Sequence, residues 1–176
     1  MTILVTGATG TIGSQIVGQL AGKGGDIRAL VREPEKARLP QGVTAMKGDM
    51  LDVESMRAAL SGVSTLFLLN AVVPDEFTQA LITLNLAREA GIERIVYFSV
   101  IHSDIYVNVP HFAGKHAVER MIEQMGMHAT ILRPAYFINN DLNSKQAILE
   151  HGVYPMPVGN RGLAMVDIRD RRSGRP

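Results

Sequence analysis

The first thirteen residues constrain the fold of this chain most, because they join an apolar run to a glycine-rich turn and then to helix-forming sequence. The run Ile3-Leu4-Val5-Thr6 precedes Gly7-Ala8-Thr9-Gly10-Thr11-Ile12-Gly13. Gly7 allows a tight turn out of a strand, Gly10 allows backbone N–H groups to approach a pyrophosphate, and Gly13 allows a helix to pack closely on the strand. The pattern predicts an anion on the helix N-terminus, where free N–H groups and the helix dipole favour negative charge. A glycine-rich turn without a ligand is the alternative.

Strand-like and helix-like segments alternate along the next hundred residues. Apolar runs predict strands at residues 27–31, 43–46, 65–69, 94–100 and 129–132. Helical spacing of apolar residues predicts helices at 12–20, at 53–60, from a cap at Asp75 to Gly91, and from Pro110 to Gly126. Such alternation is typical of right-handed βαβ units, so the predicted fold is α/β with a doubly wound parallel sheet, covered on both faces.

Composition excludes several classes of partner. Eighteen basic residues against seventeen acidic ones leave a formal charge of +1 on 176 residues, so no chain-wide field attracts nucleic acid or an anionic membrane. The chain contains no stretch of about 18 unbroken apolar residues that would span a membrane. It contains no cysteine, hence no disulfide and no thiolate metal site, and we expect no metal. These features favour a cytoplasmic protein whose redox chemistry would need a cofactor.

In a doubly wound sheet, ligands bind at the carboxyl ends of the strands, which selects the candidate cofactor residues. Arg32 follows the second strand and offers a guanidinium to a ribose 2′-phosphate, unless it is a solvated loop charge. Asp49 follows the third strand and can accept from an adenine amino group, unless it is a turn or cap residue. Asn70 and Ala71 follow the fourth strand and would line the groove, or belong to an ordinary loop.

Four further residues are candidates for catalysis. If a nicotinamide dinucleotide binds at the glycine-rich turn, its nicotinamide end should face the exits of the last two strands. Ser99 ends the fifth strand, although a loop hydroxyl is more often structural than catalytic. His111 and Lys115 lie four apart on one helix face, where Lys115 could hold ribose hydroxyls or move protons; the alternative is a solvated lysine near Glu119. Tyr136, after the sixth strand, would help to enclose the ring.

These segments together resemble the atypical short-chain dehydrogenase/reductases, specifically the NmrA-like branch with its isoflavone-reductase-like and quinone-reductase-like relatives. The resemblance covers residues 1 to about 170 and rests on the glycine-rich turn, Val31-Arg32-Glu33-Pro34, Gly48-Asp49, His111-Phe112-Ala113-Gly114-Lys115 and Leu132-Arg133-Pro134. It implies a Rossmann fold that binds NADP(H). The pyrophosphate would then contact Gly7, Thr9, Gly10, Thr11, Ile12 and Gly13, with Arg32 at the 2′-phosphate, Asp49 at the adenine and Lys115 at the nicotinamide ribose.

The resemblance also suggests how the chain is organised. Residues 1–134 would form the NAD(P)-binding domain, and residues 135–176 the start of a substrate-binding part that continues in the family. The ending Arg171-Arg172-Ser173-Gly174-Arg175-Pro176 has no apolar periodicity, and a shifted reading frame of its back-translation can encode Ile-Ala-Glu-Val-Ala. We therefore expect a product truncated by a frameshift; a natural short tail and a cloning artefact are the alternatives.

Two classes of function follow from the resemblance. Ordinary short-chain dehydrogenases use Tyr-x-x-x-Lys, whereas His111 stands where that tyrosine would be, so ketone–alcohol chemistry is not expected. The first class is an NADPH-dependent reductase of a small molecule, either a quinone or a conjugated double bond such as an enone. The second is a redox sensor that binds NADP(H) without chemistry and acts on a regulatory protein partner.

Overall fold

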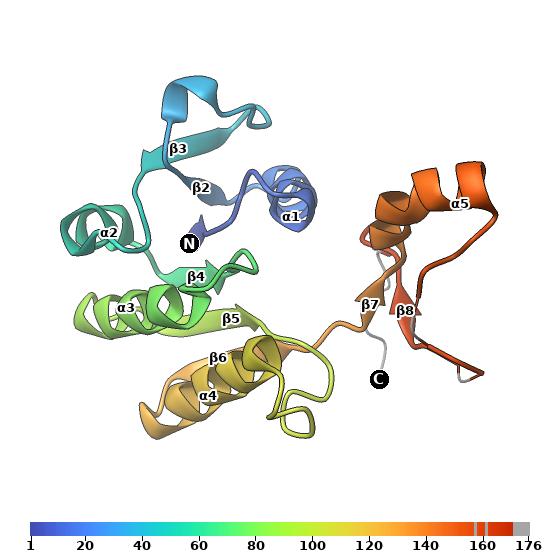
Figure 1. The fold of residues 1–176 in the computed structure, drawn as a ribbon. Helices are drawn as coiled ribbons and strands as arrows, with labels where there is room; N and C mark the ends of the chain where they lie inside the picture. The colour runs from blue at the N-terminus through green and yellow to red at the C-terminus, as the bar shows by residue number, and fades with distance from the viewer. Residues whose placement is uncertain (157, 161, 171–176) are drawn as a thin grey trace. The chain divides into compact units, whose positions relative to one another are not determined.

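Six parallel strands form the main sheet of the computed structural model, which describes residues 1–156, 158–160 and 162–170. The strands are β1 (Thr2–Val5), β2 (Asp26–Val31), β3 (Val43–Lys47), β4 (Thr65–Leu68), β5 (Arg94–Phe98) and β6 (His128–Leu132). Their order in the sheet is β3-β2-β1-β4-β5-β6, and every neighbouring pair is parallel (Figure 1). This order confirms the prediction of a doubly wound parallel sheet.

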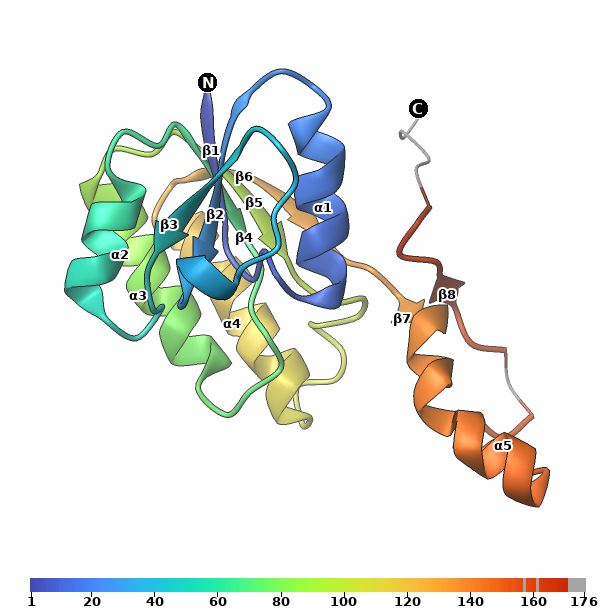
Figure 2. The same ribbon diagram turned by 90° about the horizontal axis from the view of Figure 1, so that it is seen from above.

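Helices lie on both faces of this sheet. They are α1 (Thr11–Ala21), the short 3₁₀ helix η1 (Pro34–Lys36), α2 (Val53–Leu60), α3 (Glu76–Glu89) and α4 (Pro110–Gln124). Helix α1 covers one face, and α2, α3 and α4 lie on the other (Figures 1 and 2). The predicted helices are therefore present, with ends that differ by one or two residues.

The starts of α2 and α3 show different capping. The Asp52 carboxylate accepts hydrogen bonds from the backbone N–H groups of Glu54 and Ser55, at 3.0 and 3.1 Å, and so caps α2. Asp75 precedes α3, but its side chain makes no capping hydrogen bond, so that expectation was wrong. Its backbone (φ −100°, ψ 11°) lies outside the extended region from which an N-cap side chain reaches back to the helix.

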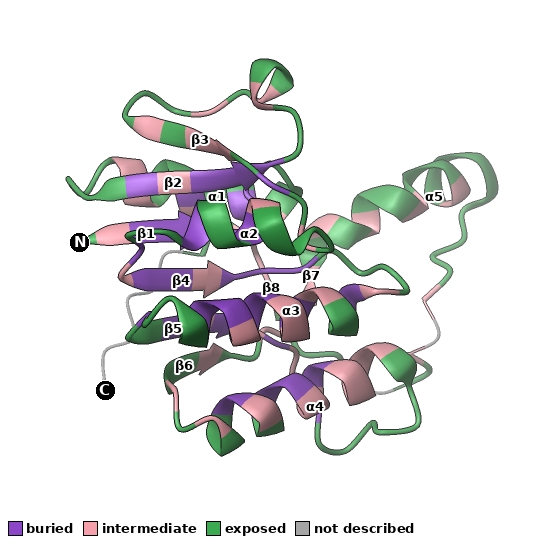
Figure 3. Ribbon diagram, turned by 90° about the vertical axis from the view of Figure 1, so that its left-hand side faces the viewer, coloured by how far each residue is buried: buried purple, intermediate pink, exposed green. Residues whose placement is uncertain are grey.

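The strands divide their side chains between two hydrophobic cores. Leu4 and Leu30 point to the core beneath α2, α3 and α4, whereas Val5 and Ala29 point to the core beneath α1. Successive side chains of a strand face opposite sides, so one apolar strand supplies both cores. Figure 3 shows the result as buried residues along β1, β2, β4 and β5. Apolar side chains therefore pack against the central strands on both faces of the sheet.

Contacts divide the chain into two units, Met1–Arg133 (unit 1) and Pro134–Pro176 (unit 2). Unit 2 contains β7 (Tyr136–Phe137) paired in parallel with β8 (Met165–Val166), the 3₁₀ helix η2 (Ile138–Ser144) and α5 (Lys145–His151). The sequence patterns predicted none of these elements. The ending Arg171 to Pro176, on which the frameshift prediction rests, lies outside the described residues. Among the described helices, none is both long and apolar enough to cross a membrane.

Candidate functional site

A cavity of about 660 Å³ opens at the carboxyl ends of β1, β2, β3 and β4. It lies where the sheet order changes direction, between β1 and β4, which is the usual ligand position in doubly wound sheets. Its volume falls in the range of roughly 300–1,000 Å³ that small-molecule sites occupy. The predicted residues that line it are Gly7, Thr9, Gly10, Thr11, Ile12, Gly13, Arg32, Asn70, Ala71 and Asp49. The remaining cofactor candidate, Lys115, is not among the lining residues.

The glycine-rich turn requires glycine at two of its positions. Gly7 has a left-handed backbone (φ +59°), and a Cβ there would lie 2.8 Å from the carbonyl oxygen of Leu69. A Cβ on Gly13 would lie 2.0 Å from the carbonyl oxygen of Gly7. The chain therefore passes closely enough to itself to bring the start of α1 against the end of β1.

The N-terminus of α1 faces the cavity without a capping side chain. Its N-cap residue is Gly10, and its first turn holds no acidic residue. The first N–H groups of a helix have no partner within the helix, and their dipole attracts negative charge. This end of α1 is thus built to receive an anion from the cavity.

Thr6 joins the exits of β1 and β4, a role that the sequence did not reveal. Its hydroxyl accepts the N–H of Leu69 and donates to the carbonyl of Leu69, both at 2.8 Å, and the residue is fully buried. A threonine at a strand end looks like any β-branched strand residue, so no local pattern marks this contact. The bridge fixes the separation of the two loops that form the cavity walls.

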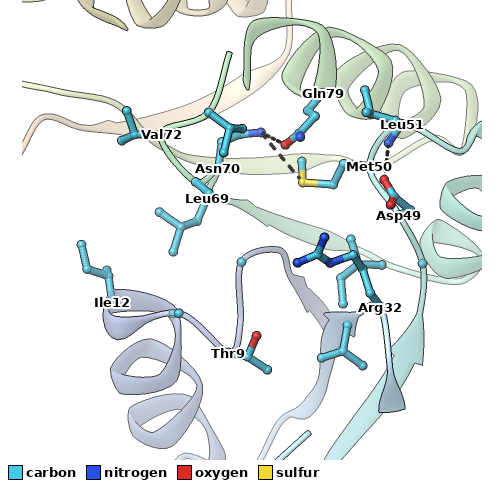
Figure 4. A pocket seen from close by; sticks show the side chains of 18 of the residues that line it. Thr9, Ile12, Arg32, Asp49, Met50, Leu51, Leu69, Asn70, Val72 and Gln79 are labelled. Atoms are coloured by element: carbon cyan, nitrogen blue, oxygen red, sulfur yellow. Dashed lines mark hydrogen bonds between the residues drawn. The ribbon is translucent and has the colours of Figure 1, made fainter. Parts of the chain in front are cut away.

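Arg32 extends from the end of β2 into the cavity (Figure 4). Within the described part of the chain, its guanidinium forms no ion pair or hydrogen bond. Asp49 lies on the neighbouring wall after β3, where its Oδ1 accepts the backbone N–H of Leu51 at 2.9 Å. One wall therefore offers an unpaired cation, and the next offers a carboxylate that is held in place by its own turn.

Asn70 stands on the opposite side of the cavity in a polar cluster that Figure 4 shows. Its Nδ2 donates to Gln79 Oε1 at 3.4 Å and lies 3.8 Å from the sulfur of Met50. Its Oδ1 is buried and has no hydrogen-bond partner among the described residues. Sequence reasoning missed both partners. Met50 follows β3, which only the folded sheet brings near the β4 exit, and Gln79 lies within α3, where no motif marks it.

The helix α4 places His111 and Lys115 in a second group of charged side chains. Lys115 is only 5% exposed, its Nζ donates to the Phe98 carbonyl at 3.2 Å, and Nζ lies 3.7 Å from Glu76 Oε2. His111 Nδ1 lies 2.5 Å from Glu76 Oε1. The alternative of a solvated lysine near Glu119 was wrong. Burial lowers the pKa of Lys115, and the negative charge of Glu76 offsets part of that effect.

Ser99 belongs to a separate buried network. Its hydroxyl donates to Glu119 Oε1 at 2.5 Å, and Ser103 donates to the same oxygen at 3.3 Å. Arg133 donates to both carboxylate oxygens of Glu119, at 3.0 and 2.6 Å. Burial alone would raise the pKa of Glu119, but these hydrogen bonds and the charge of Arg133 outweigh it and lower that pKa.

Tyr136 belongs to unit 2, on β7. Its hydroxyl donates to Asp141 Oδ1 at 3.0 Å, and the hydroxyl of Tyr154 donates to the same oxygen at 2.8 Å. Partial burial and the Asp141 carboxylate raise the pKa of Tyr136. A catalytic role of Tyr136, like those of Ser99, His111 and Lys115, stays a prediction.

Comparisons with known proteins show the family to which the chain belongs. The model of the NmrA-like family matches residues 1–170. The chain is 34% identical over 172 residues to the NAD(P)H azoreductase of Xenophilus azovorans, covering 96% of this chain and 59% of that protein. It is 33% identical over 168 residues to quinone oxidoreductase 2 of Escherichia coli, covering 92% of this chain and 58% of that protein. The chain thus spans about three fifths of the length of these curated relatives.

A solved structure with a similar fold is a complex with a nucleotide. The crystal structure of an NADPH-dependent quinone oxidoreductase from Escherichia coli, complexed with NADPH, superposes with a TM-score of 0.76 at 33% identity. The superposition covers 85% of this chain and 54% of that one.

Proposed function

Since the chain belongs to the NmrA-like family, we propose that it binds NADP(H) and acts as an NADPH-dependent reductase of a quinone or another small conjugated acceptor. The Arg32 guanidinium, which has no partner among the described residues and shares a cavity with the uncapped N-terminus of α1, carries this proposal. Two separate positive features in one cavity suit a ligand with two separate phosphate groups. The relatives named above, an azoreductase and a quinone oxidoreductase, support the reductase class.

The cavity residues would divide the dinucleotide between them. The first turn of α1 would hold the pyrophosphate, and Arg32 would hold the ribose 2′-phosphate. Asp49 would accept from the adenine amino group, while Asn70 and Ala71 would line the path between the two halves. The Oδ1 of Asn70 is buried and has no hydrogen-bond partner within the described part of the chain, so a turn of this side chain would let it accept a hydrogen bond from a ligand.

When bound, NADPH would supply the hydride for the reduction. The protein must then orient the acceptor and provide one proton, and His111 and Lys115 carry exchangeable protons near the end of β5. Burial lowers the pKa of Lys115, which makes its ammonium a better proton donor than a solvated one. Lys115 also has three N–H donors, of which the Phe98 carbonyl takes one and Glu76 lies near another, and the remaining donor would hold a ribose hydroxyl.

Titration of the protein with NADPH and NADH tests the cofactor assignment. We expect tighter binding of NADPH in the wild type, and Arg32→Ala should weaken NADPH binding by roughly 1–3 kcal/mol, as expected for a charge-assisted contact. Binding of NADH should change little, because NADH lacks the 2′-phosphate. Arg120→Ala is a matched control, since Arg120 pairs with Glu123 on the exposed surface of α4. Equal affinities for both nucleotides in the wild type would contradict the assignment.

Turnover is measured separately, as loss of NADPH absorbance in the presence of a quinone. We expect slow reduction by the wild type and a lower rate for Lys115→Met, with NADPH affinity as the second measurement. Tight NADPH binding without turnover of any quinone or enone would contradict the reductase and leave the cofactor assignment standing.

A further inference from the structure

Glu76 occupies a position that neither the nucleotide cavity nor the sequence motifs explain. It is the first residue of α3, and its neighbours Asp75 and Gln79 line the cavity. Glu76 itself is only 8% exposed and faces α4, which lies beside α3 (Figures 1 and 3). It therefore connects the helix that borders the cavity with the helix that carries His111 and Lys115.

The contact between Glu76 and His111 determines which ring nitrogen carries a proton. Glu76 Oε1 lies 2.5 Å from His111 Nδ1, and a carboxylate can only accept a hydrogen bond. With Glu76 ionised, Nδ1 carries the proton of this contact, and Nε2 is left as the other ring nitrogen. The His111 side chain is 26% exposed, so this second nitrogen is not sealed in the core.

The other carboxylate oxygen of Glu76 faces Lys115. Lys115 Nζ lies 3.7 Å from Glu76 Oε2 and 5.3 Å from the centre of the Tyr97 ring, and its hydrogen bond goes to the Phe98 carbonyl. Among the described residues, the titratable groups shown beside Lys115 are Glu76 from α3 and Tyr97 from β5, and His111 lies one helical turn away on α4. Tyr97 does not supply a charge, because burial, and then the charges of Glu76 and Glu119, raise its pKa.

We propose that Glu76 is a positioning residue of the reductase site, which holds His111 in its Nδ1–H form and keeps the buried Lys115 protonated. The proposal rests on the proposed function, since it assigns a supporting residue to the same two side chains. Glu76 touches neither the cavity nor a reacting atom, so it would act only through His111 and Lys115.

The geometry argues against a purely stabilising ion pair. Glu76 Oε2 is buried and accepts no hydrogen bond from the described residues, because its nearest cation stands at 3.7 Å. A buried carboxylate that leaves one oxygen unsatisfied adds little to stability and often costs some. Such a group is better explained by what it does to the proton positions of its two neighbours.

NMR tests the proposal without cofactor or substrate. In ¹⁵N-histidine-labelled wild-type protein at a pH where the ring is neutral, His111 should be the Nδ1–H tautomer, and Glu76→Ala should convert it to the Nε2–H form common in free histidine. His111→Asn assigns the signals. In ¹³C-lysine-labelled protein, Glu76→Gln should move the titration of Lys115 to lower pH, because the charge that raises its pKa is lost.

Glu89→Gln is the matched control, because Glu89 lies at the exposed far end of α3, near Arg57. It should leave both NMR signals unchanged. If the protein turns over a quinone, Glu76→Gln should lower kcat by roughly tenfold or more, in line with the loss of proton-transfer assistance. Its NADPH dissociation constant should stay within about twofold, since Glu76 is not in the cavity.

Two results would overturn the proposal. One is an Nε2–H tautomer of His111 in the wild-type protein, a measurement that stands even if the Glu76 variants do not fold. The other is an unchanged Lys115 titration in folded Glu76→Gln. Absence of NADPH binding would instead contradict the proposed function and leave both NMR results readable.

Discussion

A single buried carboxylate, Glu119, ties the exits of β5 and β6 to α4. Because it accepts hydrogen bonds from Ser99, Ser103 and Arg133, its removal leaves several donors without a partner. We expect Glu119→Gln to lower the free energy of unfolding by roughly 1–3 kcal/mol near neutral pH. Urea unfolding measures this change. Glu123→Gln, which removes an exposed pair with Arg120 on the same helix, should cost less than about 1 kcal/mol.

The same residue makes stability depend on pH with a defined sign. The pKa of Glu119 in the folded protein lies below its ordinary value of 4.5, so folding favours the ionised form. Its contribution is present above pH 4.5 and is lost as the pH falls through the folded-state pKa. The difference in stability between wild type and Glu119→Gln should therefore shrink in acid. A difference that is the same at neutral and acid pH would contradict this assignment.

The role of a single residue could be predicted only where it depends on residues close to it in the sequence. Gly7 and Gly13 could be predicted because the turn that needs them lies within seven residues. Glu76 and Glu119 could not, because their partners lie far along the chain: His111 is 35 positions from Glu76, and Ser99 is 20 from Glu119. A glutamate in a helix is most often a solvated residue, and only the packing of α3 and α4 shows otherwise.

Two glycines of helix α1 allow a matched test of whether close backbone contact requires glycine. Gly13→Ala should destabilise the protein by roughly 1–3 kcal/mol or more, because the new Cβ would lie 2.0 Å from the Gly7 carbonyl oxygen. Gly18→Ala, in the same helix, meets no atom within 4 Å and should stabilise by roughly 0.5–1 kcal/mol. Denaturant unfolding of both variants measures the effects. Destabilisation of equal size would contradict the explanation by close approach.

At the scale of the element, sequence periodicity was sufficient to predict the helices and strands that are apolar and long enough to show a period. The central strands and the four α-helices of unit 1 follow the predicted ranges because they bury apolar side chains in the two cores. The two-residue strands β7 and β8 are too short to carry any period, and the exposed α5 has no buried residue. The elements of unit 2 could therefore not be predicted from their own residues.

For the whole molecule, we expect residues 1–133 to fold and bind nucleotide alone. Both hydrophobic cores and every residue that lines the large cavity belong to unit 1. The NADPH dissociation constant of residues 1–133 should lie within about threefold of that of the full chain, as measured by calorimetry. A folded fragment without NADPH binding would show that unit 2 contributes to the site. That residues 135–176 begin a substrate-binding part stays a prediction.

The central place of β1 in the sheet has a consequence for biosynthesis. Val5 pairs with Phe67, and Thr6 bonds Leu69, 63 positions further along the chain. At roughly 5–20 residues per second, the ribosome needs roughly 3–12 seconds to make that intervening stretch. During this time β1 can pair only with β2, and its Leu4 side chain lacks most of its core. The first strand therefore cannot complete its pairing or its core until the chain up to Leu69 has been made.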